Sequence, residues 1–138
     1  MTDKKKVFLG GTCNNSTWRE YLIPLLKIDY YNPVVPNWTP ECQAEEIKQR
    51  TECDYVLYTI TPEMTGFYSI AEVVDDSNKR PEKTLFCVLF GEDGFRFTSH
   101  QEKSIKATME LVRNNGAQVY NNLEYVADVL NGKEVYNL

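Results

Sequence analysis

One stretch of the sequence decides the fold: CDYVLYTITPEMTGFYSIAEVVDD, residues 53–76. Within it, the β-rich run Tyr55–Ile60 has the length and composition of a strand, and Pro62, which lacks a backbone N–H, ends that strand. Thr65-Gly66 is a turn or N-cap signal, and apolar residues follow it at helical spacing: Phe67, Ile70, Ala71 and Val74. The stretch therefore predicts a strand, a loop and a helix, in that order.

Glu72 lies about two turns into the predicted helix and is the centre of the functional hypothesis. In an open α/β sheet, ligands bind at the carboxyl ends of the strands and against the loops that follow them. A carboxylate near the start of the helix can point back over that crevice, where the helix dipole and free N–H groups favour its ionised form. The alternative is a solvated surface residue, which is also how we interpret Asp75 and Asp76 further along the helix.

The rest of the chain repeats the alternation of strand and helix. Further strands are predicted at 5–10, 28–33, 84–90 and 117–120, and further helices from about Trp18 and over 39–51, 99–114 and 123–130. Five such alternations predict a single α/β domain over residues 1–138. We expect a flavodoxin-like three-layer fold, with a five-stranded, mainly parallel sheet of order 2-1-3-4-5 and helices on both faces.

Local signals place the helix ends. Three pairs have the spacing of N-caps: Thr17 with Glu20, Ser99 with Glu102, and Asn121 with Glu124. The first helix has an apolar stripe that we expect to be buried, made of Trp18, Tyr21, Leu22, Leu25 and Leu26. Pro24 should kink or shorten that helix, and residues 91–98, with a tight turn at Asp93-Gly94, are predicted to form a loop.

Composition excludes several classes of protein. The net charge of −5, with acids and bases interspersed, gives no reason to expect nucleic acid or an anionic membrane as a partner. No segment approaches the ~20 apolar residues of a membrane span. The four cysteines form no C-x-x-C pair and His100 is the only histidine, so we expect no metal, no cofactor and reduced thiols in a cytoplasmic protein.

A second polar segment, Gly10–Ser16, follows the first predicted strand. Its glycines permit positive φ and close approach to a ligand, but it matches neither the Walker motif nor G-x-G-x-x-G, so a plain strand-to-helix turn stays open. The expected strand order brings this segment beside the loop 61–66 and Glu72, with Asn32 and Trp38 flanking. Trp38 could line this pocket or plug the edge of the core.

The residue types near the crevice narrow the chemistry. The single histidine lies elsewhere in the sequence, so neither a Ser–His–Asp set nor a Cys–His pair is available. What remains is a carboxylate with aromatic neighbours: Phe8, Trp18, Trp38 and Tyr68. An ionised glutamate in such a pocket can attack an anomeric carbon and form a glycosyl-enzyme, while a ring stacks on a base or a sugar.

An ordered set of short motifs adds a family resemblance. The motifs are VFLGGT followed by Trp18-Arg19, YNP at 31–33 with Asn37-Trp38, the strand CDYVLYTITP, and the block TGFYSIAE at 65–72. In this order they resemble the nucleoside 2-deoxyribosyltransferase superfamily, and more closely its nucleoside 2-deoxyribosyltransferase-like branch. The resemblance covers roughly the first two-thirds of the chain.

The resemblance implies a double displacement at a nucleoside. In that family the glutamate of the TGFYSIAE-like block is the nucleophile, which matches Glu72. The acid that opens the preceding strand holds the deoxyribose or the nucleophile, which matches Asp54. Glu72 would attack C1′ of a 2′-deoxyribonucleoside, expel the base, and pass the sugar to a second base or to water with retention. Such enzymes complete their sites with a neighbouring subunit, so a homo-oligomer is expected.

Two positions depart from the family pattern. The family's first strand carries a tyrosine that orients the nucleophile, where this chain has Phe8, and a second aspartate stands where this chain has Gly66. Both positions nevertheless belong to the predicted substrate-binding set, which is Gly10, Gly11, Thr12, Asn32, Trp38, Gly66, Phe8 and Tyr68.

Three functions stay open on these grounds. The first is a nucleoside 2-deoxyribosyltransferase. The second is an N-glycoside hydrolase of a nucleoside or nucleotide, whose phosphate could meet a polar set made of Thr12, Asn14, Ser16 and Arg19. The third is a non-catalytic nucleotide-binding protein of the same fold. In each case the partner is a small nucleoside or nucleotide.

Overall fold

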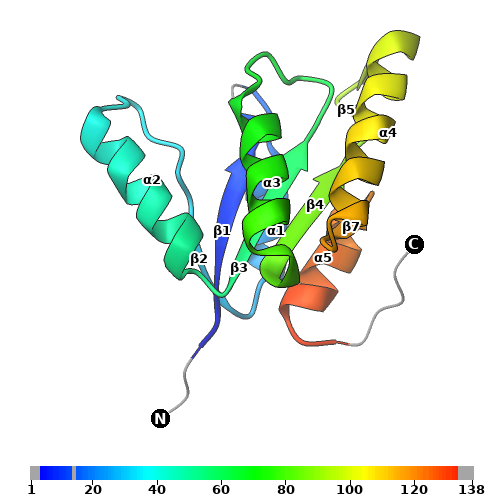
Figure 1. The fold of residues 1–138 in the computed structure, drawn as a ribbon. Helices are drawn as coiled ribbons and strands as arrows, with labels where there is room; N and C mark the ends of the chain where they lie inside the picture. The colour runs from blue at the N-terminus through cyan, green and yellow to red at the C-terminus, as the bar shows by residue number, and fades with distance from the viewer. Residues whose placement is uncertain (1–3, 14, 134–138) are drawn as a thin grey trace.

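The computed structural model describes residues 4–13 and 15–133 and has a central five-stranded parallel sheet (Figure 1). The strand order is β2-β1-β3-β4-β7, which is the flavodoxin-like order expected for the five sheet strands. All four neighbouring pairs are parallel. The strands are β1 (Lys6–Gly11), β2 (Asp29–Tyr31), β3 (Tyr55–Ile60), β4 (Thr84–Val88) and β7 (Gln118–Tyr120).

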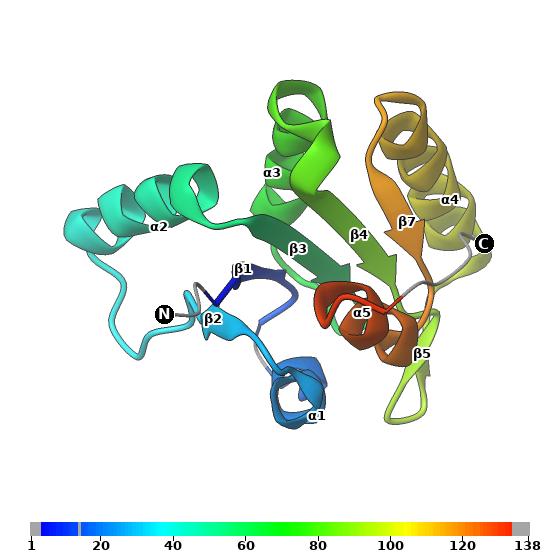
Figure 2. The same ribbon diagram turned by 90° about the horizontal axis from the view of Figure 1, so that it is seen from below.

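Five α-helices in the described ranges cover the two faces of this sheet. Viewed along the layers, α1 and α5 lie on one face and α2, α3 and α4 on the other (Figure 2). None of them is long and apolar enough to cross a membrane. The helices are α1 (Trp18–Leu22), α2 (Pro40–Glu52), α3 (Tyr68–Lys79), α4 (Ser99–Asn114) and α5 (Leu123–Leu130).

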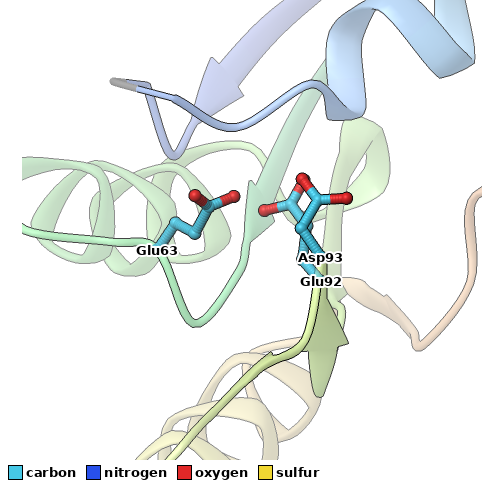
Figure 3. A group of neighbouring side chains, drawn as sticks. All are labelled: Glu63, Glu92 and Asp93. Atoms are coloured by element: carbon cyan, nitrogen blue, oxygen red, sulfur yellow. The ribbon is translucent and has the colours of Figure 1, made fainter.

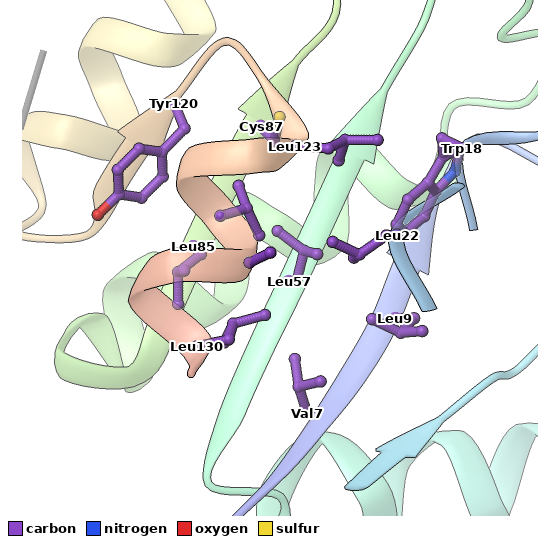
Figure 4. Close-up of a cluster of buried hydrophobic side chains, with 12 residues drawn as sticks. Val7, Leu9, Trp18, Leu22, Leu57, Leu85, Cys87, Tyr120, Leu123 and Leu130 are labelled. Carbon is purple, nitrogen blue, oxygen red and sulfur yellow. The ribbon is translucent and has the colours of Figure 1, made fainter. Parts of the chain in front are cut away.

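Alternation along the strands divides the core into two layers. Val7 and Leu9 of β1 point to the face with α1 and α5, whereas Phe8 points to the face with α3 and α4. Both sides of β1, β3 and β4 are buried, which is why these strands read as continuous apolar runs. Figure 4 shows the first layer, where Trp18 and Leu22 of α1 meet the sheet beside α5.

The first helix differs from its prediction in two respects. The side chain of Thr17 makes no cap hydrogen bond, and Tyr21 and Leu25 are exposed instead of buried. The prediction for Pro24 is confirmed, because α1 ends at Leu22 and continues as a 3₁₀ turn over Ile23–Leu25. A helix this short buries only the side chains that face the sheet directly.

Two other predicted caps are shifted by one residue. In α4 the capping box is formed by Thr98 and Gln101, not by Ser99 and Glu102. In α5 the N-cap is Asn122, whose side-chain oxygen accepts from the N–H of Tyr125 at 2.8 Å. In each case a polar residue adjacent to the predicted one supplies the cap.

The predicted loop 91–98 contains a small antiparallel hairpin. Its strands are β5 (Gly91–Glu92) and β6 (Phe95–Arg96). The turn at Asp93-Gly94 is confirmed, with φ of 51° and 84° at the two positions. Positive φ at both central residues is the signature of the hairpin turns that suit twisted strands.

We predict that Gly11→Ala strongly destabilises the protein. Gly11 has φ +123°, and an added Cβ would lie 2.0 Å from the carbonyl oxygen of Thr59 on the paired strand. The backbone must move, so we expect a loss of about 3 kcal/mol or more in the free energy of unfolding, measured by urea denaturation. Gly66→Ala is the control, because nothing lies within 4 Å of its added Cβ. Equal stability of the two variants would contradict the described packing.

Candidate active site

The loops after β1 and β3 lie side by side at the carboxyl ends of the sheet. The N–H of Thr12 donates to the carbonyl of Thr59 at 2.9 Å, and the N–H of Thr61 donates to the hydroxyl of Thr12 at 3.0 Å. Between the loops is a crevice of about 220 Å³, lined by Gly11, Thr12, Cys13, Met64, Thr65, Gly66, Tyr68 and Ser69. Four of the predicted substrate-binding residues therefore line one crevice: Gly11, Thr12, Gly66 and Tyr68.

The glycines of the first loop permit close packing. A Cβ on Gly10 would lie 2.6 Å from the ring of Tyr58 and 2.9 Å from the ring of Phe8. Gly10 thus allows two aromatic rings to pack against the end of β1, while Gly11 allows the approach of β3. Packing within the fold therefore accounts for both glycines, and the plain-turn interpretation of the segment stays open.

Trp18 and Arg19 fix the shape of the same loop. The Arg19 guanidinium is buried and donates to the carbonyls of Leu9, at 3.0 and 3.1 Å, and of Thr12, at 2.8 Å. The indole N–H of Trp18 donates to the same Thr12 carbonyl at 2.8 Å. Arg19 was expected to be available for a phosphate, and its burial on carbonyl oxygens overturns that expectation. Asn14, the other candidate in that set, lies outside the described residues.

Glu72 lies on the side of α3 that faces α2. Its side chain is 12% exposed, and its Oε2 lies 3.5 Å from Nη1 of Arg50. Tyr68, one helical turn earlier on the same face, lines the crevice. Glu72 therefore lies about one turn into the helix from the crevice, closer to the helix start than predicted.

The environment of Glu72 raises its pKa to about 7. Burial is the main cause, and the nearby carboxylates of Glu46, Asp76 and Asp75 add to it, while Arg50 acts in the opposite direction. The start of the helix was expected to favour the ionised form of this carboxylate, whereas its environment in the structure favours the protonated form. Desolvation outweighs the helix dipole, which is felt strongly only within the first turn of a helix.

A buried charge cluster surrounds Arg50, which the sequence did not single out. Its guanidinium donates to Asp76 at 3.0 and 3.1 Å and to Asp75 at 3.1 Å. Asp76 is fully buried and also accepts from the hydroxyl of Tyr58 and from Arg80. Asp76 is therefore not the solvated helix end that we predicted. The sequence did contain one signal for this cluster. Residues 72, 76 and 80 are two acids and a base spaced four apart, which places their side chains on one face of the helix.

The aromatic candidates divide into buried and open rings. Phe8 is 2% exposed and stacks on Tyr31 with ring centroids 5.9 Å apart. Its ring is therefore part of the core and is not available to contact a ligand. Trp38 is 56% exposed, which excludes the core-plug interpretation, and its side chain hydrogen-bonds to Glu46. Tyr68 is 63% exposed at the crevice. Two open rings thus remain for stacking.

Asp54 and Asn32 are also absent from the lining of the crevice. Asp54 precedes β3, at the opposite edge of the sheet, where its carboxylate accepts from the N–H of Lys6 at 2.8 Å. The prediction that Asp54 joins the pocket is wrong in this geometry, because the crevice lies at the other end of the same strand. The Asn32 side chain caps a turn by accepting from the N–H of Val34, and it lines a separate hollow of about 130 Å³ with Cys13.

Among the described residues, one acidic group has the spacing of cation ligands. Glu63, Glu92 and Asp93 offer oxygens that all lie within 4.8 Å of one another (Figure 3). Glu92 also accepts from the Ser16 hydroxyl at 2.8 Å, which fastens the β5–β6 hairpin to the loop after β1. Burial and the neighbouring Glu92 raise the pKa of Glu63. This acidic group borders the crevice at the loop after β3.

Comparison of the sequence with protein families gives evidence that does not depend on the structure. A family model described as "Nucleoside 2-deoxyribosyltransferase like" matches residues 4–89 of the 138. The matched span runs from β1 to the end of β4 and includes both crevice loops, α2 and α3. A comparison with curated proteins finds no similar sequence.

We predict that Glu72→Gln removes a pH-dependent loss of stability. The folded pKa of about 7 lies above the ordinary value of 4.5, so the folded state holds the proton more tightly than the unfolded state. Stability conferred by the protonated form is present below about pH 4.5 and declines as pH rises through 7.

The measurement is urea denaturation of wild type and Glu72→Gln at several pH values from 4 to 8. Relative to the variant, wild type should lose about 2–3 kcal/mol across this range, because each pKa unit corresponds to ~1.4 kcal/mol. Titrations of other groups cancel in the difference between the two proteins. Parallel curves for wild type and variant would show that Glu72 titrates normally.

Proposed function

The chain belongs to the nucleoside 2-deoxyribosyltransferase-like family, and from this premise we propose that it cleaves the N-glycosidic bond of a 2′-deoxyribonucleoside. Glu72 is the nucleophile of the proposed reaction, and a second base accepts the deoxyribose. The observation that carries the proposal is the buried Glu72 carboxyl, one turn from the crevice and inside the span that matches the family.

The raised pKa of Glu72 suits this role. With a pKa of about 7, a large fraction of the carboxyl is ionised at neutral pH, and the carboxylate is poorly hydrated because the side chain is buried. A poorly hydrated carboxylate is a better nucleophile than one on the surface, and it can form an ester with an anomeric carbon.

The proposed reaction has two displacements. A Glu72 oxygen attacks C1′, the C1′–N bond breaks, and the base leaves with the electron pair and takes up a proton. A nitrogen of the second base then attacks C1′ from the opposite face and gives up its proton, and the electron pair of the ester bond returns to Glu72. Two inversions give net retention.

The crevice dimensions favour a small sugar over a whole nucleoside. Its volume of about 220 Å³ is below the ~300 Å³ at which sites for drug-sized ligands begin. We therefore place the deoxyribose against Gly11, Thr12 and Gly66, and the base against the open ring of Tyr68. Phe8 has no part in this arrangement beyond packing in the core. Asp54 is left out because it lies at the amino ends of the strands, away from the crevice.

Hydrolysis is the second candidate, since water can replace the second base in the same mechanism. The two reactions differ only in the acceptor, and the family description fits both. The cysteines Cys13, Cys42, Cys53 and Cys87 are all free, which favours a reducing compartment such as the cytoplasm. The homo-oligomer stays a prediction from the resemblance.

We predict a covalent deoxyribosyl adduct on the wild-type protein. Intact-mass spectrometry after mixing with purine and pyrimidine 2′-deoxynucleosides should detect it, and Glu72→Ala should abolish both the adduct and the release of base. Glu110→Ala is the matched control, because Glu110 is an exposed helical glutamate whose ion pair is with Arg113. Addition of a second base then yields either a new nucleoside, for transfer, or free deoxyribose, for hydrolysis.

One outcome would rule out the proposed chemistry. If wild type forms no adduct and releases no base from nucleosides or their monophosphates, the family fold serves binding alone in this chain. Calorimetric titration with the same compounds would then measure that binding directly.

A further inference from the structure

We propose that Arg50 is the positioning residue for Glu72: it holds Oε2 of the carboxylate and leaves Oε1 to attack the sugar. This inference rests on the proposed function for its catalytic meaning, but the contact itself can be tested without any reaction. Arg50 comes from α2 and Glu72 from α3, so the pair also connects the two helices beside the site.

The guanidinium of Arg50 is oriented by groups other than Glu72. Its Nε and Nη2 donate to the two oxygens of Asp76, and Nη2 also donates to Asp75. This fork-on-fork arrangement fixes the plane of the guanidinium. The remaining amino group, Nη1, then faces Glu72 at 3.5 Å. A lysine has one nitrogen and could not serve both sides at once.

Asp76 is a firm anchor for this arrangement. It is fully buried in the last turn of α3, and the Tyr58 hydroxyl and the Arg80 guanidinium hold it in place. Because Arg80 shares the charge of Asp76 and Lys79 shares that of Asp75, the positive charge of Arg50 is not fully balanced by these two carboxylates. A net attraction to Glu72 therefore remains, although both partners are largely removed from water.

The groups that face Glu72 come from three elements. Arg50 and Glu46 lie on α2, Tyr58 lies on β3, and Asp75 and Asp76 lie on α3 itself. Arg50 is the cation among them. Burial and the surrounding acids favour the protonated carboxyl, and Arg50 is the group that keeps the carboxylate accessible near neutral pH.

The same contact suits both displacements. When Oε1 forms the ester, Glu72 loses its charge, but Arg50 keeps its bonds to Asp75 and Asp76 and is not left unpaired. When the ester breaks, the electron pair returns to Oε1 and the carboxylate reforms against a cation that has not moved. Arg50 thus lowers the cost of the second step without touching the sugar.

The test begins with the carboxyl titration of Glu72, followed by carbon-13 NMR in the full-length protein and assigned by its loss in Glu72→Gln. In wild type we expect a midpoint near 7. In Arg50→Met the midpoint should rise by about one pH unit or more, and in Arg50→Lys by less, because the lysine keeps a charge but not the fork. Arg113→Met, a change at an exposed ion pair on α4, should leave the midpoint where it is.

Circular dichroism and urea denaturation establish that each variant is folded, and Arg50→Lys carries the test alone if Arg50→Met does not fold. A folded Arg50 variant with an unchanged midpoint would overturn the inference. The second readout is the pH profile of adduct formation in a single turnover, which should shift to higher pH by the same amount as the titration. A profile that keeps its position in the folded variant would also overturn it.

The two readouts separate this inference from the proposed function. A shifted titration with no adduct in wild type removes the proposed chemistry and leaves the Arg50–Glu72 contact established. An adduct in wild type with an unshifted titration in the variants removes the role of Arg50 and leaves the proposed chemistry intact.

Discussion

The candidate site depends on one buried interaction, the contact of the Arg19 guanidinium with the carbonyl oxygens of the loop after β1. A buried cation must be matched by strong acceptors, and here backbone carbonyls take the place of a carboxylate. Trp18 donates to the same Thr12 carbonyl, so two side chains of α1 hold the backbone where β1 ends. The crevice begins at this point, beside the close approach of β3 at Gly11.

A second buried arginine organises the opposite side of the site by a different principle. Arg19 acts on the backbone within one strand–helix unit, whereas Arg50 joins carboxylates across two helices. Both solve the same problem, since a charge removed from water is tolerated only with several partners. The first holds the backbone beside the crevice, and the second opposes the effect of burial on the pKa of Glu72.

Much of the fold follows from the sequence, and less of the site does. The strands Tyr55–Ile60 and Thr84–Val88 were predictable because fully buried parallel strands are apolar throughout. The hairpin at 91–96 was missed because its strands are two residues each, too short for any periodicity. Asp54 was misplaced because its role was taken from the family resemblance, although it precedes the amino end of β3 and the crevice lies at the carboxyl end. The partnership of Arg50 with Asp76 was invisible, since it joins residues 26 apart through packing of α2.

The composition of α2 has a consequence for motion. Arg50 is the residue of α2 that is classed as buried, and the helix is otherwise largely polar. Few apolar contacts therefore oppose local detachment of α2 from the sheet. Helices with few buried apolar contacts can detach locally at low free-energy cost while the rest of the protein stays folded. Each opening would admit water to the Glu72 carboxyl and weaken its proton affinity toward the ordinary value. The proton affinity of this carboxyl would therefore be an average over the open and closed positions of α2.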